Sequence, residues 1–390
     1  MRRTVLHLID TGGPGGAETV FLELATRLNS ERWRSVAVVP SRDWLHGALR
    51  ERGVEPVVLR SRRAFDAGYL AALHRLGARE GAALIQTHLL TTWVYGSAVA
   101  RLRRLPLVGT LHGAVDLPEG DRHRALKLRL TRRDASRVVF VSESLRRTLL
   151  QREPIAAART LVIRNGIDLD HWTPGADDAF RSALGLRPGE LLVTAVGNVR
   201  QSKDYENLLR AAAWLRDRGT TCRIAVAGDT RGGGLYEGLL VLRRELGLDD
   251  TVSFLGFEAD VRRVLWNSDV YVLASSQEGF SLTTVQALAC GVPVVATRSG
   301  GPEEIVSDGA EGLLVPVRDP AALGAAVRKL LLDAPLRARM AEAGRRRAEA
   351  FGVDRMVAAY ERLYDELTGS PDRGGEGAGS SAPVAAEWQA

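Results

Sequence analysis

Cysteine and long apolar runs are both scarce in this sequence. The two cysteines, Cys222 and Cys290, cannot build a disulfide framework and have no metal-ligand residues near them in sequence, which excludes small domains held together by disulfides or zinc. We expect both thiols to fill the core of a protein in a reducing cytoplasm. The longest apolar runs have the length of a strand, such as LLVTAV from Leu191, so a bilayer-spanning helix is excluded as well.

Signals for export and for nucleic-acid binding are also missing. Only a few apolar residues separate Arg3 from Asp10, too few for the apolar region of a secretory signal peptide. The chain has no zinc-finger spacing, no RNP-like aromatic motif and no clear recognition helix. We therefore expect a cytoplasmic protein that does not bind nucleic acid.

Length and composition favour two globular domains. A chain of 390 residues is too long for one ordinary core, and 45% apolar and 26% charged residues are globular values. The last part of the chain, residues 369–390, has almost nothing to bury, so we expect it to form a disordered tail.

Positive charge is concentrated in the first half. Residues 1–165 hold 28 Lys and Arg against 15 Asp and Glu, a balance of +13, whereas residues 166–390 hold 25 against 32, a balance of −7. This asymmetry predicts that the first half faces an anionic partner, either a phosphorylated acceptor or a membrane surface. The basic stretch RHRALKLRLTRR, residues 122–133, could lie on a membrane or could be an ordinary solvated helix face.

Short β-rich runs alternate with helical patterns along the chain, which predicts an α/β fold with parallel sheets covered on both faces. The runs in the first half are TVLHLID, SVAVVP, VEPVVL, ALIQTH, LVGTLH and RVVFVS. The alternation restarts at Leu191 with LLVTAVG, CRIAVAG, TVSFLG, DVYVLAS and VPVVAT. Two doubly wound, Rossmann-like domains follow.

The junction between these domains is expected in VIRNGIDLDHWTPG, where turn residues interrupt the periodicity. We expect a first domain over residues 1–165, a second over 166–350, and a helix over 351–368 that packs back towards the first. The packed face of this helix is predicted to carry Met356, Tyr360, Leu363 and Tyr364. Because open α/β sheets bind ligands beyond the carboxyl ends of their strands, we expect a shared site in a cleft between the domains.

The segment TGGPGGAE, residues 11–18, follows the first strand and precedes a helix that begins near Ala17. It fails the dinucleotide pattern G-x-G-x-x-G, which needs a glycine where Glu18 stands. Its glycines, Gly15 and Gly16 among them, would still let backbone approach a ligand near the amides of a helix start. A glycine-rich turn without a ligand is the alternative.

The segment GNVRQSKDYENLL, residues 197–209, places two cations after the first strand of the second domain. Arg200 and Lys203 could hold a diphosphate there and stabilise its departure, because Arg forms a fork on phosphate oxygens and Lys acts as a point charge. Ordinary surface cations are the alternative.

The segment EGFSLTTVQALACGVP, residues 278–293, predicts a loop that enters a short amphipathic helix. Ser281 is the expected N-cap, and Gly291 occupies the position of a left-handed residue at the helix end. Glu278 and Gln286 could both face an anionic ligand held by the amides at the helix start, or could be ordinary surface groups.

Two further polar residues are candidates for the cleft. His112 ends the run GTLH and Asp168 lies in the junction, although a lone histidine at a strand end is more often structural. Asp168 and Asp170 form a D-x-D pattern, which marks a metal site in some enzymes. Because this pattern falls in the hinge rather than at a nucleotide pocket, we expect no metal.

Taken together, residues from about 3 to about 366 resemble the family-4 glycosyltransferases of the GT-B fold. The resemblance implies two doubly wound domains whose parallel sheets face each other across a cleft. It also implies transfer of a sugar from a nucleotide-sugar, without a metal and with retention of anomeric configuration, to a glycan, lipid-linked or small-molecule acceptor. The motifs that carry the resemblance are TGGPGGAE, GTLHG, VSES, VIRNGID, the Lys203 segment, VSFLGF, EGFSLTTVQALACGVPVVAT, SGGPEEIV and GLLVP.

By the pattern of that family, Glu278 and His112 are catalytic residues that contact the donor sugar, Lys203 and Arg200 hold the diphosphate, and the residue at position 286 holds the ribose. The donor is a substrate, expected to be UDP- or GDP-linked, and no cofactor is implied. An anionic membrane surface is a further expected partner, on the inner face of the membrane. The implied donor-binding residues are Gly15, Gly16, Arg200, Lys203, Phe257, Glu278, Gly279, Phe280, Ser281, Leu282, Thr283 and Gln286.

Two positions depart from the family pattern. The family usually has Glu where Gln286 stands, and often has Arg where Asn198 stands. No residue is an obvious nucleophile, so the resemblance favours same-face attack in which the leaving phosphate accepts the acceptor's proton. A nucleotide-sugar 2-epimerase of similar architecture and a catalytically inactive nucleotide-binding homologue remain as alternatives.

Overall fold

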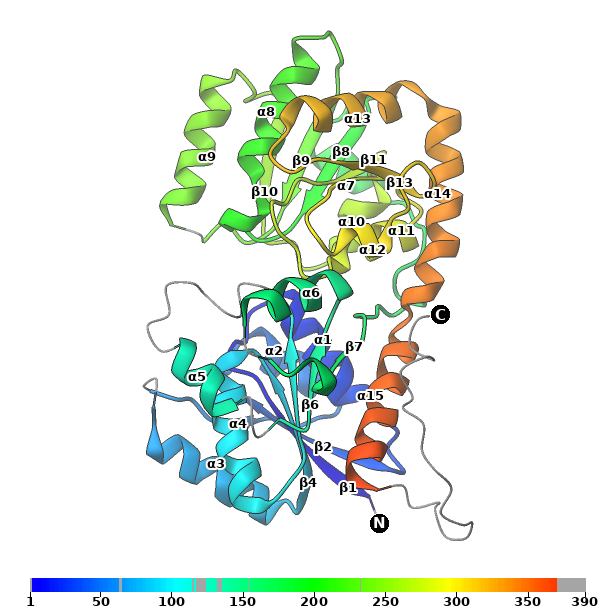
Figure 1. Cartoon of the computed structure of the whole chain (residues 1–390). Helices are drawn as coiled ribbons and strands as arrows, with labels where there is room; N and C mark the ends of the chain where they lie inside the picture. Colours follow the sequence, from blue (N-terminus) through cyan, green and yellow to red (C-terminus); the bar gives the residue numbers. More distant parts are fainter. Residues whose placement is uncertain are drawn as a thin grey trace. The chain divides into compact units, whose positions relative to one another are not determined.

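The computed structural model describes residues 2–62, 65–113, 116, 124–131, 135–153, 155–231 and 233–369 (Figure 1). The chain forms two compact units. The first consists of Met1–Arg164 and the chain from Met356 onward, and the second of Asn165–Arg355. Apart from Gly369, the expected tail lies outside the described residues, and so do the ends of the basic stretch 122–133.

The described part of the first unit is built on a seven-stranded parallel sheet with the order β3-β2-β1-β4-β5-β6-β7. Its strands are β1 (Arg3–Leu8), β2 (Trp33–Val39), β3 (Val57–Val58), β4 (Ala82–His88), β5 (Leu107–Leu111), β6 (Arg137–Phe140) and β7 (Thr160–Val162). Its helices are α1 (Gly16–Arg27), α2 (Trp44–Glu51), α3 (Ala67–Arg79), α4 (Leu90–Arg103), α5 (Arg124–Thr131), α6 (Glu143–Arg152) and the short η2 (Ala157–Arg159).

The second unit has a six-stranded parallel sheet with the order β10-β9-β8-β11-β12-β13. Its strands are β8 (Leu192–Val196), β9 (Arg223–Ala227), β10 (Val252–Gly256), β11 (Val270–Leu273), β12 (Val294–Thr297) and β13 (Gly312–Val315). Its helices are α7 (Asp178–Ala183), η3 (Gln201–Lys203), α8 (Tyr205–Arg216), α9 (Gly234–Glu245), α10 (Val261–Trp266), α11 (Leu282–Ala289), α12 (Pro302–Ile305), α13 (Pro320–Leu332), α14 (Ala334–Ala348) and η4 (Glu349–Phe351).

The α/β prediction with parallel sheets is confirmed, and every run expected as a strand contains one. The central strands carry continuous apolar residues because helices cover both faces of each sheet; Val193, Val270 and Val295, for example, are fully buried. Two strands were not predicted, β7 and β13. Each has only three or four residues, too few for a clear pattern in the sequence.

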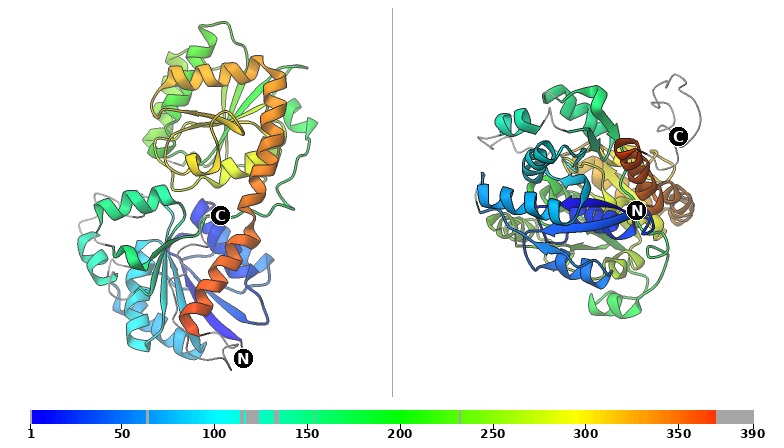
Figure 2. Two further views of the ribbon diagram at one scale, coloured as in Figure 1. Left: turned by 45° about the vertical axis from the view of Figure 1, so that its right-hand side comes forward. Right: turned by 90° about the horizontal axis from the view of Figure 1, so that it is seen from below.

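Helix α15 (Val353–Thr368) lies along the sheet of the first unit from Met356 onward (Figure 2). The hydroxyls of Tyr360 and Thr110 form a hydrogen bond of 3.1 Å, and the hydroxyl of Tyr364 donates to Gln86 Oε1 at 2.9 Å. The four residues of its predicted apolar stripe are all buried. Buried hydroxyls with partners fix the register of this helix against β4 and β5.

Two smaller predictions can be compared with the structure. Cys222 and Cys290 are free thiols buried in the second unit, as expected for core residues. In the part of the chain that the structure describes, no helix has both the length and the apolar character needed to cross a bilayer.

Candidate functional site

The strand order reverses once in each sheet, and the crevice at such a point is where doubly wound sheets bind ligands. In the second unit the reversal falls between β8 and β11, and the segments that leave these strands carry Lys203 and Glu278. In the first unit it falls between β1 and β4, which lead into the glycine-rich loop and into α4. The topology therefore places most of the predicted site residues near the two strand-order reversals, where doubly wound sheets bind ligands.

Lys203 and Glu278 form an ion pair. Lys203 Nζ lies 2.7 Å from Glu278 Oε1, and both side chains are mostly buried, with 20% and 12% of their surface exposed. The hydroxyl of Ser275 donates to the same carboxylate oxygen at 2.6 Å. Since Ser275 follows β11 closely and Lys203 ends η3 after β8, this network joins the two strand ends at the reversal point.

The turn that carries Lys203 is shaped by its neighbours. A Cβ on Gly197 would lie 2.8 Å from Lys203 Cε, so glycine leaves the room that the lysine stem occupies. Asp204 follows in the left-handed conformation, with φ 48°, and caps α8 by accepting from the amide of Asn207. The hydroxyl of Tyr205 donates to the carbonyl of Gly197 at 2.6 Å. These contacts hold the Lys203 turn against the end of β8.

Helix α11 begins at Leu282, shortly after Glu278, and no side chain caps its first amides. Ser281 is its N-cap residue as predicted, but with φ 84° it lies in the left-handed region and its side chain caps nothing. Its hydroxyl instead pairs with that of Thr284 at 2.9 Å. The first amides of a helix have no partner within the helix, so those of Leu282 and Thr283 remain available to an anionic ligand. Gly291 ends the helix with φ 75°, as predicted.

Several predicted donor-binding residues of this segment contribute side chains to the core. Phe280 is 2% exposed and its ring packs edge-on against Phe351, and Leu282 is also buried. Thr283 Oγ1 accepts a hydrogen bond from the hydroxyl of Tyr271. Gln286 lies in the middle of α11 with 9% of its surface exposed. The side chains of Phe280 and Leu282 are therefore not free to contact a donor, and these residues can offer only their backbone. The hydroxyl of Thr283 is already engaged by Tyr271, so its backbone is also the group best placed to contact a donor.

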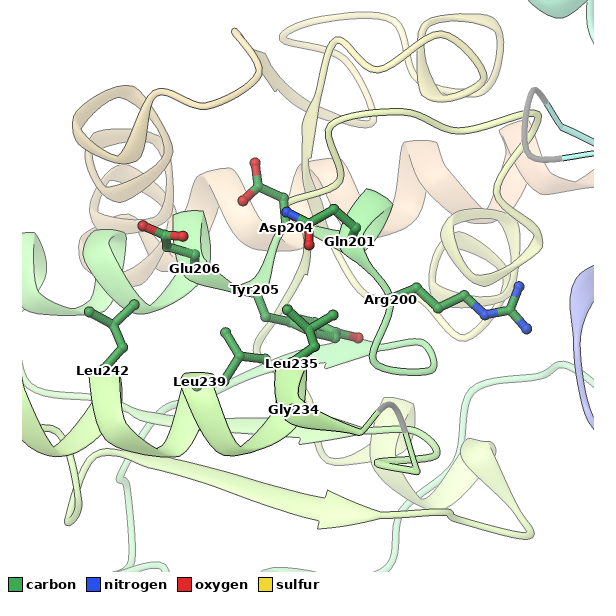
Figure 3. A pocket seen from close by; sticks show the side chains of 10 residues that line it. Arg200, Gln201, Asp204, Tyr205, Glu206, Gly234, Leu235, Leu239 and Leu242 are labelled. Atoms are coloured by element: carbon green, nitrogen blue, oxygen red, sulfur yellow. The ribbon is translucent and has the colours of Figure 1, made fainter. Parts of the chain in front are cut away.

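Arg200 is exposed and precedes η3 at the rim of a hollow of about 300 Å³ between α8 and α9 (Figure 3). Figure 3 shows its side chain extended away from Leu239 and Leu242, which line the same hollow. Asn198, at the position where the resembled family often has Arg, accepts from the amide of Asp229 at 3.0 Å and so ties the loops after β8 and β9 together. The lining residues are Arg200, Gln201, Asp204, Tyr205, Glu206, Gly234, Leu235, Gly238, Leu239 and Leu242.

In the first unit, the glycine-rich loop leads directly into α1. Gly15 is the N-cap residue of this helix and Gly16 is exposed. A Cβ on Gly15 would lie 2.5 Å from a carboxylate oxygen of Glu18, which folds back over the loop. The carboxylate of Glu18 thus lies beside the backbone of the turn. Because its negative charge repels phosphate, this turn suits a phosphate less well than backbone amides alone would.

His112 follows β5 and pairs with a second histidine. Its Nε2 lies 2.9 Å from Nδ1 of His88, the last residue of β4, and the two rings are nearly parallel. Burial lowers the pKa of His112 to about 3 and that of His88 well below its ordinary value, so both rings are neutral at pH 7. His112 can therefore supply a hydrogen bond to a ligand but no positive charge.

The backbone around His112 is held by Asp116. Its carboxylate accepts from the amides of His112 and Gly113. Burial, with smaller contributions from the negative charges of Asp10 and Glu18, raises the pKa of Asp116 to about 7. The loop that carries His112 therefore depends on a carboxyl group that titrates near neutral pH.

Two candidates lie apart from these clusters. Phe257 follows β10 and is 51% exposed, as a residue beside a ligand can be. The carboxylate of Asp168 accepts from the amide of Asp170, so the first residue of the D-x-D pattern stabilises its own turn. Among the described residues no group of three or more His, Cys, Asp or Glu side chains is placed to hold a metal ion.

Sequence reasoning missed His88, Asp116 and Ser275. His88 and His112 end two neighbouring strand runs, and the ends of adjacent parallel strands meet at one sheet edge, so this pairing could have been found. Asp116 and Ser275 carry no such signal, because a lone carboxylate or hydroxyl in a loop gains its role only from the folded backbone.

The fold is that of a protein with two doubly wound α/β units, each with a ligand-binding crevice where its strand order reverses, and comparison with known proteins gives the family. Residues 176–347 match the family model described as glycosyl transferases group 1, and residues 14–171 match the one described as glycosyltransferase family 4. A D-inositol 3-phosphate glycosyltransferase of Salinispora arenicola is 31% identical over 400 residues, covering 93% of this chain and 89% of that protein. The chain therefore belongs to the family-4 glycosyltransferases, and the resemblance seen in the sequence is confirmed.

A second relative is matched over a smaller part of its length. The D-inositol 3-phosphate glycosyltransferase of Mycobacterium sp. (strain JLS) is 37% identical over 274 residues, covering 66% of this chain. The match spans 60% of the length of that mycobacterial protein.

Solved structures show the fold. HepE of Anabaena, in complex with UDP and glucose, superposes with a TM-score of 0.85 at 23% identity, covering 94% of this chain and all of that chain. Sucrose-phosphate synthase from Thermosynechococcus elongatus gives a TM-score of 0.78 at 22% identity, covering 94% and 99%. The fold is GT-B, as predicted.

Proposed function

We propose that this protein is a retaining glycosyltransferase that moves a sugar from a nucleotide-sugar to an acceptor hydroxyl. The observation that carries the proposal is the ion pair of Lys203 and Glu278 at the reversal point of the second sheet, beside the open amides of α11. A cation and free amides suit a diphosphate, and a carboxylate suits sugar hydroxyls. In the donor complex the diphosphate replaces Glu278 as the ion-pair partner of Lys203, and the carboxylate of Glu278 accepts hydrogen bonds from the hydroxyls of the donor sugar.

The proposed chemistry depends on positioning and charge. The bond between the anomeric carbon and the leaving phosphate oxygen breaks, a bond to the acceptor oxygen forms on the same face, and the acceptor's proton passes to the leaving phosphate. Lys203, the amides of Leu282 and Thr283, and the nearby guanidinium of Arg200 stabilise the charge that develops on the diphosphate. His112 gives the donor sugar a neutral hydrogen bond.

The proposed donor is a UDP-linked sugar and the proposed acceptor a phosphorylated polyol. Structures of HepE with UDP and with UDP-glucose support the first choice. The relatives named D-inositol 3-phosphate glycosyltransferase support the second, as does the +13 balance of residues 1–165. Peripheral binding to the inner face of the membrane belongs to the same proposal, because a basic surface also attracts anionic lipid.

A transfer assay tests this function. The protein is incubated with UDP-glucose, UDP-N-acetylglucosamine or GDP-mannose, with and without inositol 3-phosphate, and products are identified by mass spectrometry and by the anomeric proton signals. We expect release of UDP and an α-linked product that depends on the acceptor. A changed sugar configuration without acceptor would instead indicate an epimerase, and nucleotide binding without turnover of any donor would indicate an inactive homologue.

A further inference from the structure

Two histidines meet at the carboxyl edge of the first sheet. His88 is completely buried at the end of β4, and His112 is half-buried just after the neighbouring β5. Their ring nitrogens, His88 Nδ1 and His112 Nε2, are 2.9 Å apart. On its other side His88 meets the ring of Phe21 edge-on, with centroids 5.3 Å apart.

Two arrangements of the N–H groups are possible when both rings are neutral. A neutral imidazole has one N–H and one lone pair, so one ring must donate and the other accept. If His88 Nδ1–H donates, His112 carries its own N–H at Nδ1. If His112 Nε2–H donates, the remaining N–H lies at His88 Nε2.

The surroundings decide between them. In the part of the chain that the structure describes, neither His88 Nε2 nor His112 Nδ1 has a hydrogen-bond partner. An N–H at His88 Nε2 would stay unsatisfied in the core, where no ligand can reach it, and a buried N–H without a partner is rarer in proteins than an unpaired acceptor. Both nitrogens are shielded from solvent in the free protein, but His88 has no exposed surface at all, whereas the ring of His112 is partly exposed at the edge of the sheet. Only a proton carried by His112 can therefore come to face a bound sugar hydroxyl.

We infer that His88 is a positioning residue that fixes the tautomer and the ring orientation of His112, so that His112 offers its Nδ1–H to a hydroxyl oxygen of the donor sugar. This inference rests on the proposed function for its ligand, but the tautomer itself is a property of the protein alone. His112 is then a hydrogen-bond donor throughout the reaction and not a base. Loss of His88 lets the ring rotate and lets the proton move to Nε2.

Three variants separate positioning from packing. His88→Phe keeps a ring against Phe21 but removes the hydrogen bond, whereas His88→Asn restores an N–H donor near the position of Nδ1. His7→Phe is the matched control, because His7 is also completely buried and packs edge-on against Phe21, at 6.0 Å. Circular dichroism and thermal melting establish that each variant is folded.

We expect kcat of His88→Phe to fall roughly 100-fold, as for a misplaced group at a reacting centre, while its dissociation constant for UDP stays at the wild-type value. His88→Asn should recover most of the lost kcat, and His7→Phe should stay within a few-fold of the wild type. Wild-type activity in His88→Phe, or an equal loss in His88→Phe and His88→Asn, would overturn the positioning role.

Nitrogen-15 NMR of the histidine-labelled protein tests the tautomer directly. The His112 signals are identified by their disappearance in His112→Gln, and we expect the shifts of an Nδ1–H ring in the wild type that move towards the Nε2–H pattern in His88→Phe. An Nε2–H ring in the wild type would overturn the inference. If no donor is turned over by the wild type, the proposed function fails while this measurement still decides the tautomer.

Discussion

The ammonium of Lys203 and the carboxylate of Glu278 lie 2.7 Å apart and connect the strand ends on either side of the reversal point in the second sheet. The pattern of the family assigns one to the diphosphate and the other to the sugar. Their contact places both groups within a few ångströms of one another, as a ligand that joins a phosphate to a sugar carbon requires.

Replacing each partner should separate binding from turnover. Glu278→Ala should lower kcat roughly 100-fold or more, with UDP affinity nearly unchanged, because in the proposed donor complex the carboxylate contacts the sugar and not the nucleotide. Lys203→Ala should weaken both, since the ammonium binds the diphosphate. Calorimetry with UDP and transfer rates measure the two effects, and Arg346→Ala, from an exposed ion pair with Glu342, is the control. Equal losses of UDP affinity in the Lys203 and Glu278 variants would contradict these roles.

The sequence predicts where Lys203 and Glu278 stand along the chain, because each follows an apolar strand run. It does not predict that they touch, since 75 residues separate them and their contact depends on β8 and β11 being neighbours. The pairing of His88 with His112 is different, because both residues end strand runs that follow one another along the chain and pair in the sheet. Ser281 shows a local failure: its identity favours a capping side chain, but its left-handed backbone turns the hydroxyl to Thr284.

Transfer should not depend on a divalent metal. In the proposed donor complex, Lys203, Arg200 and the amides of α11 supply the positive charge that a metal would otherwise give the leaving diphosphate. Initial rates should be the same with EDTA as with added magnesium or manganese. A rate that vanishes with chelator and returns with the metal would contradict this prediction.

The basic first half should bind anionic membranes in a salt-dependent way. Its charge balance predicts co-sedimentation with vesicles of phosphatidylglycerol and phosphatidylcholine at 25 mM salt, and a steep loss of binding as the Debye length falls from about 20 Å to about 8 Å at 150 mM salt. Vesicles of phosphatidylcholine alone are the control. If the protein ignores anionic vesicles even at low salt, a soluble phosphorylated acceptor remains as the anionic partner.

Stability should fall in mild acid because of buried neutral histidines. Burial lowers the pKa of His7 to about 3 and that of His88 well below the ordinary 6.5, so between these values the unfolded chain binds protons that the native protein does not. The free energy of unfolding should therefore fall as pH drops below about 6.5, by up to about 1.4 kcal/mol per pH unit for each histidine. Asp116, with its raised pKa, acts in the opposite direction.

A difference measurement isolates one of these groups. His7→Gln removes a single titrating side chain and leaves Asp116 and His88 in place. Urea unfolding at pH 7.5, 6.0 and 5.0 should show a shallower pH dependence for the variant, by about one bound proton. Parallel curves for the variant and the wild type would show that His7 is protonated in the native state.

Gln286 is the clearest departure from the family, and its replacement tests where the ribose lies. If the side chain reaches the ribose, Gln286→Glu should tighten uridine binding by about 1 kcal/mol, because a charged acceptor forms the stronger hydrogen bond. For UDP this gain is opposed, because the new carboxylate repels the diphosphate. For both ligands it is reduced, because a side chain with only 9% of its surface exposed is poorly hydrated when it is charged. Dissociation constants for uridine and UDP separate these contributions, since only UDP carries the phosphates. We expect tighter uridine binding and a smaller gain or a loss for UDP; unchanged values for both ligands would make Gln286 a structural residue of α11.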